Sequence, residues 1–97
     1  MSSTTNFKNF VIEQLQDLDE ISCRQMMGEF LLYHKGVLFG GIYDDRFLIK
    51  PTKSNEKYGL QEEIPYESAK PMRFVENLDD RDYLKKLIQE TCADLKK

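Results

Sequence analysis

The residues that decide the fold are CRQMMGEFLLY at positions 23–33 and GVLFGGIYDDRFLIKP at positions 36–51. Branched and aromatic apolar residues dominate two runs within them, 30–33 and 37–43, as is typical of β-strands. The runs are separated by His34-Lys35-Gly36, and a three-residue connection that ends in glycine is typical of a bulged hairpin. We therefore expect two antiparallel strands here, with the only histidine of the chain in the turn.

A third run, 47–50, follows Asp44-Asp45-Arg46, and aspartate tolerates turn conformations better than most residues. Pro51 cannot donate a ladder hydrogen bond, so this strand ends there. The pair Gly40-Gly41 indicates a bulge or a place where a helix packs close to the backbone, and residues 23–27 can add a strand before the others. The middle of the chain therefore predicts an antiparallel meander.

Amphipathic helices are predicted at both ends of the chain. Towards the N-terminus, after capping residues within 2–5, apolar residues and one glutamine recur with helical spacing. They are Phe7, Phe10, Val11, Gln14, Leu15 and Leu18. Near the C-terminus Asp79 is the expected N-cap, and the buried stripe is Leu84, Leu87, Ile88, Thr91 and Leu95.

The segment between the meander and the last helix contains mostly loop-forming residues. We expect a loop over 52–66, with a short helical turn at 55–58, and a final strand within 71–76 that places Met72 and Phe74 on one face. The fold class is therefore α+β: an antiparallel sheet of four to five strands with both terminal helices packed on one face. Residues 1–97 form a single domain with its core at about 7–95. The residues expected to be largely buried are Phe10, Leu15, Leu84, Leu87 and Ile88.

Composition and charge exclude several classes of function. The net charge of −3 disfavours a surface for nucleic acid, so we expect no direct DNA binding. The longest apolar run, 37–43, is far shorter than the ~20 residues of a membrane span. The first twenty residues lack the pattern of a secretory signal, so we expect a cytoplasmic protein.

The sequence offers no constellation for catalysis or metal binding. His34 is isolated, and neither Cys23 nor Cys92 has a ligand partner nearby, so we expect neither a metal nor a cofactor. Both thiols are expected to be buried, reduced and slow to react. The paired carboxylates, such as Asp44-Asp45, serve turns and caps, and adjacent strand residues point to opposite faces. We therefore expect that the chain is not an enzyme.

One sheet face gathers the residues best suited to binding. The candidate interaction face consists of Arg24, Tyr33, Asp44, Arg46 and Lys50. A modest basic patch can also form if Arg46 and Lys50 share a face with Arg73.

The motifs around this sheet resemble the N-terminal domain of the TfoX/Sxy family, bacterial regulators of natural competence. The matching residues are 22–29, Leu32-Tyr33, 39–42, 44–50, 69–72 and 78–80. Family members typically show Met-Phe-Gly where this chain has Met26-Met27-Gly28, and often Tyr-Gly where it has Phe30-Leu31. The resemblance implies a domain like those of secretion chaperones, with helices over a curved antiparallel sheet.

The resemblance also implies a regulatory context. Full-length family regulators carry a second, C-terminal helical domain similar to DNA-binding helix-hairpin-helix modules, and act with the cAMP receptor protein at promoters. No second domain is visible in the 97 residues, so we expect a standalone module that binds a protein partner. The alternative is a domain that binds a small molecule or acts on an unknown substrate. Pairing into a homodimer is also expected, because a meander leaves unpaired edges.

Overall fold

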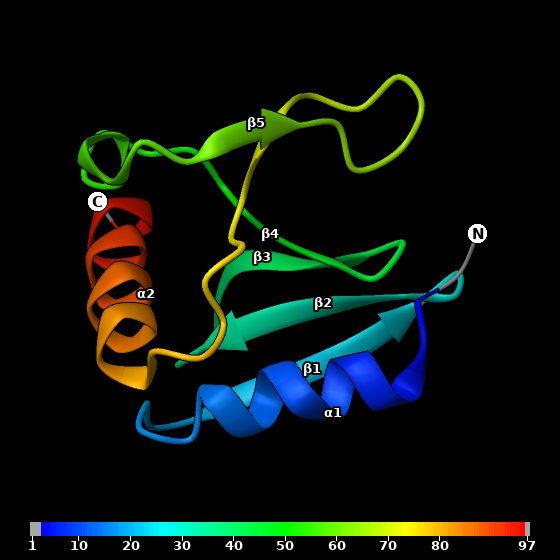
Figure 1. Ribbon diagram of the computed structural model, residues 1–97, viewed down its shortest axis with the longest axis horizontal. Helices are drawn as coiled ribbons and strands as arrows, with labels where there is room; N and C mark the ends of the chain where they lie inside the picture. The colour runs from blue at the N-terminus through cyan, green and yellow to red at the C-terminus, as the bar shows by residue number, and fades with distance from the viewer. Residues whose placement is uncertain (1–2, 97) are drawn as a thin grey trace.

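The computed structural model describes residues 3–96 and contains two α-helices, one 3-10 helix and six strands. In chain order the elements are α1 (Thr5–Gln14), β1 (Ile21–Met26), β2 (Glu29–His34), β3 (Val37–Tyr43), β4 (Arg46–Ile49), η1 (Glu56–Tyr58), β5 (Gln61–Glu63), β6 (Met72–Phe74) and α2 (Arg81–Leu95). Figure 1 shows α1 running along the lower side of the sheet and α2 standing at one end of it.

Three successive hairpins build the first four strands, and each turns over two residues. Both turn residues have positive φ in every hairpin, as type I′ turns require. These residues are Met27 and Gly28, Lys35 and Gly36, and Asp44 and Asp45. The expectation of a three-residue loop at 34–36 is therefore wrong. His34 is the last residue of β2, pairs with Val37 and is buried, because its imidazole lies on the face that the helices cover.

The sheet has the strand order β1-β2-β3-β4-β6-β5, and every neighbouring pair is antiparallel. The α+β fold is confirmed, with slightly more strands than the four to five expected. The additional strand is β5, within the segment expected to be a loop. Its sequence, Gln61-Glu62-Glu63, carries no apolar signal, and its only neighbour in the sheet is β6.

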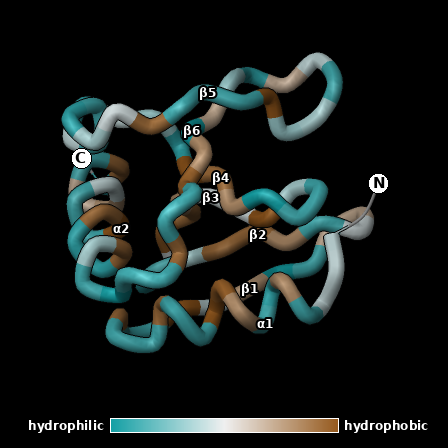
Figure 2. Tube along the Cα trace, viewed as in Figure 1, coloured by the Kyte–Doolittle hydropathy of each residue, from teal (hydrophilic) through white to brown (hydrophobic). Residues whose placement is uncertain are grey.

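The core lies between one face of the sheet and both α-helices, as expected. Alternate strand residues, among them Phe30, Leu32 and Ile42, point into it. The same cluster contains Val11 and Leu15 from the N-terminal part of the chain and Leu84, Leu87 and Ile88 from α2. In Figure 2 the hydrophobic colour runs along β2 and β3, whereas much of α1 and α2 is hydrophilic.

The N-terminal helix differs from the expectation in two respects. It ends at Gln14 rather than near Leu18, although Leu18 is still buried. Phe10, expected in the core, is 39% exposed. The side chains of Val11 and Leu15 fill the space over the sheet, so Phe10, about 100° around the helix from Val11, lies at the margin of the contact.

The caps of both helices follow ordinary capping chemistry. Thr4 accepts a hydrogen bond from the amide of Phe7, and Asp80 accepts one from the amide of Tyr83. Asp80, not Asp79, is therefore the N-cap of α2. The two aspartates are adjacent and chemically equivalent, so only the backbone conformation distinguishes them.

A buried amide joins the second half of the chain. Asn55 is fully buried; its Nδ2 donates to the carbonyl of Lys50 and to Oγ1 of Thr91, each at 3.0 Å. Its Oδ1 accepts from the amide of Thr52 at 3.1 Å. One side chain thus holds the end of β4, the start of η1 and the middle of α2 together.

Candidate interaction site

The face of the sheet opposite the helices is the candidate site, and we call it the open face. The residues that point to this face alternate with the core residues, and several are apolar. Leu31, Tyr33 and Leu38 are half-buried there, and Met26 at the end of β1 is 51% exposed. An exposed apolar strip of this kind is unusual on a solvated surface.

Four of the five candidate residues lie on the open face. Arg24 is exposed on β1 and pairs with Leu31, while Tyr33 occupies the next strand. Arg46 pairs with Tyr43, and Lys50 follows the end of β4. Asp44 lies instead in the β3–β4 turn, where its backbone amide donates to the carboxylate of Glu29 at 3.2 Å.

Arg73 does not join this group, so the expected patch of Arg46, Lys50 and Arg73 is wrong. Arg73 pairs with Ile49, a core residue, which places Arg73 on the helix-covered side. Its Nε atom is buried without a hydrogen-bond partner within residues 3–96. A shift of one residue in the pairing of β4 with β6 would turn Arg73 to the other face of the sheet. The sequence does not reveal this register.

A hollow of about 460 Å³ opens between the open face and the loop 64–71 that joins β5 to β6. Leu38, Tyr43 and Met72 come from the sheet, and Leu95 comes from the end of α2. The remaining lining residues are Gly40, Lys50, Pro51, Pro65, Tyr66, Ala69, Lys70 and Pro71. The loop thus forms a wall, and the hollow extends the open face towards α2.

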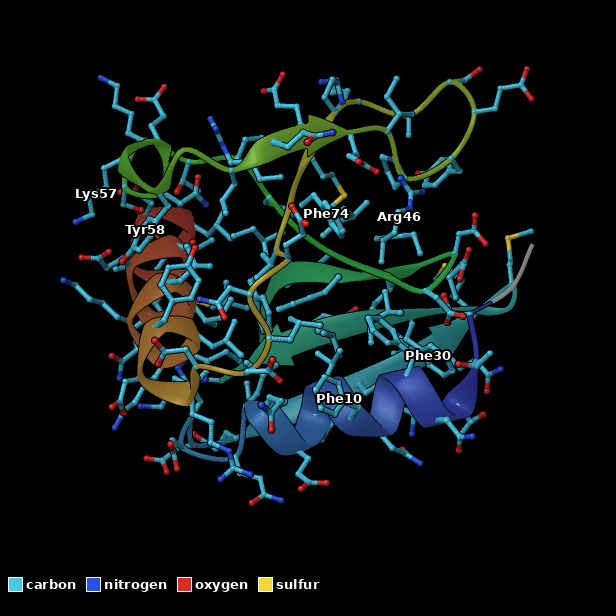
Figure 3. All side chains as sticks on the ribbon, viewed as in Figure 1. Phe10, Phe30, Arg46, Lys57, Tyr58 and Phe74 are labelled. Atoms are coloured by element: carbon cyan, nitrogen blue, oxygen red, sulfur yellow. The ribbon has the colours of Figure 1, made fainter. Side chains whose placement is uncertain are left out.

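Arg46 holds this wall in place. Its Nη1 forms an ion pair with Oε1 of Glu63 at 2.7 Å, and its Nη2 donates to the carbonyls of Ile64 and Pro65 at 3.2 and 3.3 Å. Its Nε donates to the carbonyl of Tyr43 at 3.2 Å. In Figure 3 Arg46 lies between the β3–β4 hairpin and the loop. The guanidinium, expected to contact a partner, is therefore engaged within the domain.

Two aromatic rings line the hollow next to Arg46. The ring centroids of Tyr43 and Tyr66 are 6.1 Å apart, and Tyr66 is 64% exposed. Burial, and secondly the neighbouring Tyr66, raise the pKa of Tyr43 above its ordinary value. The ring of Tyr43 lies against Gly41, where an added Cβ would come within 2.5 Å of the carbonyl oxygen of Phe30. The backbones close to Gly40 and Gly41 are those of β4 and β2, not of a helix. Of the two expectations for this pair, the bulge is the one found, because the β2–β3 register shifts between Leu32 and Tyr33.

The two thiols differ in exposure. Cys92 is buried as expected, and burial raises its pKa to about 11. Cys23 is exposed, so the expectation that it is buried is wrong. It lies on β1, the edge strand, where only one neighbouring strand shields it. Partial burial still raises the pKa of Cys23, against the opposing effect of Lys8.

Sequence reasoning missed the loop half of the site. Pro65, Tyr66, Ala69 and Lys70 lie in a segment without strand or helix periodicity, and only their contact with the sheet gives them a role. The available signals were the two prolines near the ends of the loop, Pro65 and Pro71, and the family-like run 69–72. No cluster of three or more His, Cys, Asp or Glu residues suited to a metal ion occurs within residues 3–96. Neither helix in that range has the length and apolar composition needed to cross a bilayer.

Comparison with known proteins identifies what this domain is similar to. The family model of the TfoX N-terminal domain matches residues 13–95. Over 72 residues the chain is 31% identical to a protein of Spirochaeta aurantia described as "Uncharacterized 12.7 kDa protein in trpE 5'region". That alignment covers 72% of this chain and 63% of the relative, which is less than two thirds of its length.

Proposed function

Because this chain belongs to the TfoX N-terminal domain family, we propose that it is a non-catalytic regulatory module that binds a protein partner on the open face, in the bacterial cytoplasm. The family has a competence and regulatory character, which supports a role in regulation. The observation that carries the proposal is a helix-free sheet face with a strip of apolar side chains, Met26, Leu31, Tyr33 and Leu38.

Site-specific photocrosslinking in the native bacterium tests this proposal. A benzophenone amino acid at Tyr33 should give a discrete crosslinked band, because this half-buried ring lies within the apolar strip. The same probe at Gln16, which is exposed beyond the end of α1, serves as the control and should give none. Leu31→Glu should remove the band at Tyr33 by placing a charge in the strip. Equal bands from positions 33 and 16 would reject the open face as the docking surface.

We further propose that the chain pairs with a second copy along β1. The residues that flank the two-residue β1–β2 turn, Met26 and Glu29, form a hydrogen-bonded pair, and such pairs alternate along the ladder. The outward backbone groups of β1 are therefore those of Ile21, Cys23 and Gln25. Within residues 3–96 no strand pairs with them on that side, because β1 is the edge of the sheet.

Charge selects the register of this pairing. An antiparallel pair centred on Cys23 places Arg24 opposite Ser22 of the second copy, whereas centring on Arg24 would place two arginines opposite each other, which is unfavourable. Facing Cα atoms of a hydrogen-bonded pair lie about 5.5 Å apart. A short bifunctional maleimide should then join two chains through Cys23. Cys92→Ser should leave the product unchanged and Cys23→Ser should abolish it, whereas a product that depends on Cys92 would contradict the pairing.

The alternative function, a domain that binds a small molecule, is favoured by one observation. The hollow of about 460 Å³ has the size of pockets that hold small ligands, about 300–1,000 Å³. A thermal-shift screen tests it, since a ligand at 100 times its Kd stabilises the folded state by about 2.7 kcal/mol. A raised melting temperature that is lost in Ala69→Phe, which fills the hollow, would support it.

A further inference from the structure

The walls of the hollow are mostly apolar. Leu38 and Met72 come from the sheet, Leu95 from α2, and Ala69 with the prolines from the loop. Arg46 does not itself line the hollow, but it holds the loop wall in place through the backbone carbonyls of Ile64 and Pro65. The hollow is therefore already formed in the domain and suits an apolar body.

The charge on the lining has one sign. Lys50 and Lys70 are the only charged side chains among the lining residues, and no carboxylate is present there. The ion pairs within residues 3–96 involve Arg46, Lys57 and Arg81, so neither lysine is neutralised by a described carboxylate within 4.0 Å. In a chain with 17 acidic and 14 basic residues, two lysines without a facing acid mark a local preference for anions.

Hydroxyl groups add to this preference. Tyr43 and Tyr66 line the same hollow, and a phenol donates a hydrogen bond to an anion. A phenol with the ordinary pKa of about 10 is protonated at neutral pH, and burial raises the pKa of Tyr43 further. The lining thus combines apolar walls with lysine and tyrosine donors.

We infer that the hollow binds a small molecule with an apolar body and one anionic group, such as a carboxylate or sulfonate, which Lys50 and Lys70 hold. This inference rests on the alternative function above and needs no protein partner, although Leu38 belongs both to the hollow and to the apolar strip of the open face. Charge-assisted hydrogen bonds from the ammonium groups supply the selectivity for an anion, and the apolar walls supply contact area.

A pair of fluorescent probes tests the inference. 8-Anilinonaphthalene-1-sulfonate and N-phenyl-1-naphthylamine share one apolar scaffold, and only the first carries a negative charge. The wild-type domain should bind the sulfonate more tightly than the neutral probe. Lys50→Met combined with Lys70→Met keeps the apolar stems and removes both charges, and should weaken sulfonate binding by at least about tenfold. Binding of the neutral probe should change less than about twofold.

Two further variants locate the binding. Lys53→Met removes an exposed lysine that does not line the hollow and should change neither affinity. Ala69→Phe should weaken both probes, and its melting temperature shows whether the domain remains folded. If the domain binds the neutral probe and the double variant loses no affinity for the sulfonate, the inference is overturned. The proposed small-molecule function would then still stand. Binding of neither probe by the wild type would overturn both.

Discussion

Arg46 links two parts of the chain that the sequence leaves unconnected. Its guanidinium bonds Glu63 and two loop carbonyls, 17 to 19 residues away. Only a planar group with several fixed donors can satisfy these acceptors together with the carbonyl of Tyr43. The residue that charge alone suggests as a partner contact therefore has an internal role.

Removing this guanidinium should release the loop. We expect Arg46→Ala to destabilise the domain by about 1–3 kcal/mol in urea unfolding, because a charged hydrogen-bonded group and its acceptors lose their partners. Chymotrypsin should also cut faster after Tyr66, which is 64% exposed. Glu63→Gln keeps the two carbonyl bonds and should have a smaller effect. Unchanged cleavage in Arg46→Ala would show that the loop is held by other contacts.

Tyr58 and Glu90 form a second link, between η1 and α2. The phenol donates to Oε1 of Glu90, whose Oε2 accepts from Lys57 at 3.0 Å. In Figure 3 Tyr58 and Lys57 lie beside α2. Burial, followed by the hydrogen bond to Glu90, raises the pKa of Tyr58 to about 12. The hydrogen bonds from Tyr58 and Lys57 lower the pKa of Glu90.

The raised pKa has a direct consequence for stability at alkaline pH. The folded state favours the protonated phenol, so the contribution of Tyr58 is complete below the ordinary pKa of about 10 and is lost as pH rises towards about 12. Tyr58→Phe should be less stable than wild type at pH 8, and the difference should shrink above pH 10. Urea midpoints between pH 8 and 12 measure this. A difference that is constant across the range would contradict the shift.

At the scale of elements, Asn55 has the largest expected effect. Asn55→Ala should leave the carbonyl of Lys50, the amide of Thr52 and the hydroxyl of Thr91 with one partner fewer in a buried site. An unsatisfied buried group costs about 1–3 kcal/mol, so the urea midpoint should fall clearly. Thr91→Val removes only one of these bonds and should cost less. A larger loss in Thr91→Val than in Asn55→Ala would show that packing at α2, not the amide, is decisive.

The elements also show what the sequence can predict. Runs of branched and aromatic residues located β2, β3 and β4, because these central strands pack a face against the helices. β5 was missed because its polar side chains show no apolar periodicity. Its stability comes instead from backbone pairing with β6. The exposed positions of Phe10 and Cys23 were missed for a related reason. Periodicity shows which residues share a face, but not how far the opposing layer reaches over it.

At the scale of the molecule, the candidate site was predicted only in part. Arg24, Tyr33, Arg46 and Lys50 share the open face because β-strand alternation and hairpin register carry them there. The hollow depends on the loop 64–71, whose position is set by tertiary contacts rather than by its own pattern. The sequence does not indicate that Lys70, which lies in this loop, lines the same hollow as Lys50.

The whole-molecule charge predicts that the domain does not bind DNA. Affinity for duplex DNA comes largely from lysine and arginine replacing counterions on phosphates, and non-specific binders reach Kd values of about 10⁻⁴–10⁻⁶ M at physiological salt. Here 17 acidic residues outnumber 14 basic ones, Arg73 lies on the face away from Arg46 and Lys50, and Lys57 is paired with Glu90.

Fluorescence anisotropy with a labelled duplex in low salt measures this directly. We expect no binding at micromolar protein, because the remaining lysines on the open face are too few to outweigh repulsion from the acidic surface. The variant Lys50→Met combined with Lys70→Met, already required for the probe experiment, is the matched comparison and should give the same flat titration. Micromolar binding that weakens steeply with salt, and that this variant abolishes, would instead assign the two lysines of the hollow to phosphate rather than to a small apolar anion.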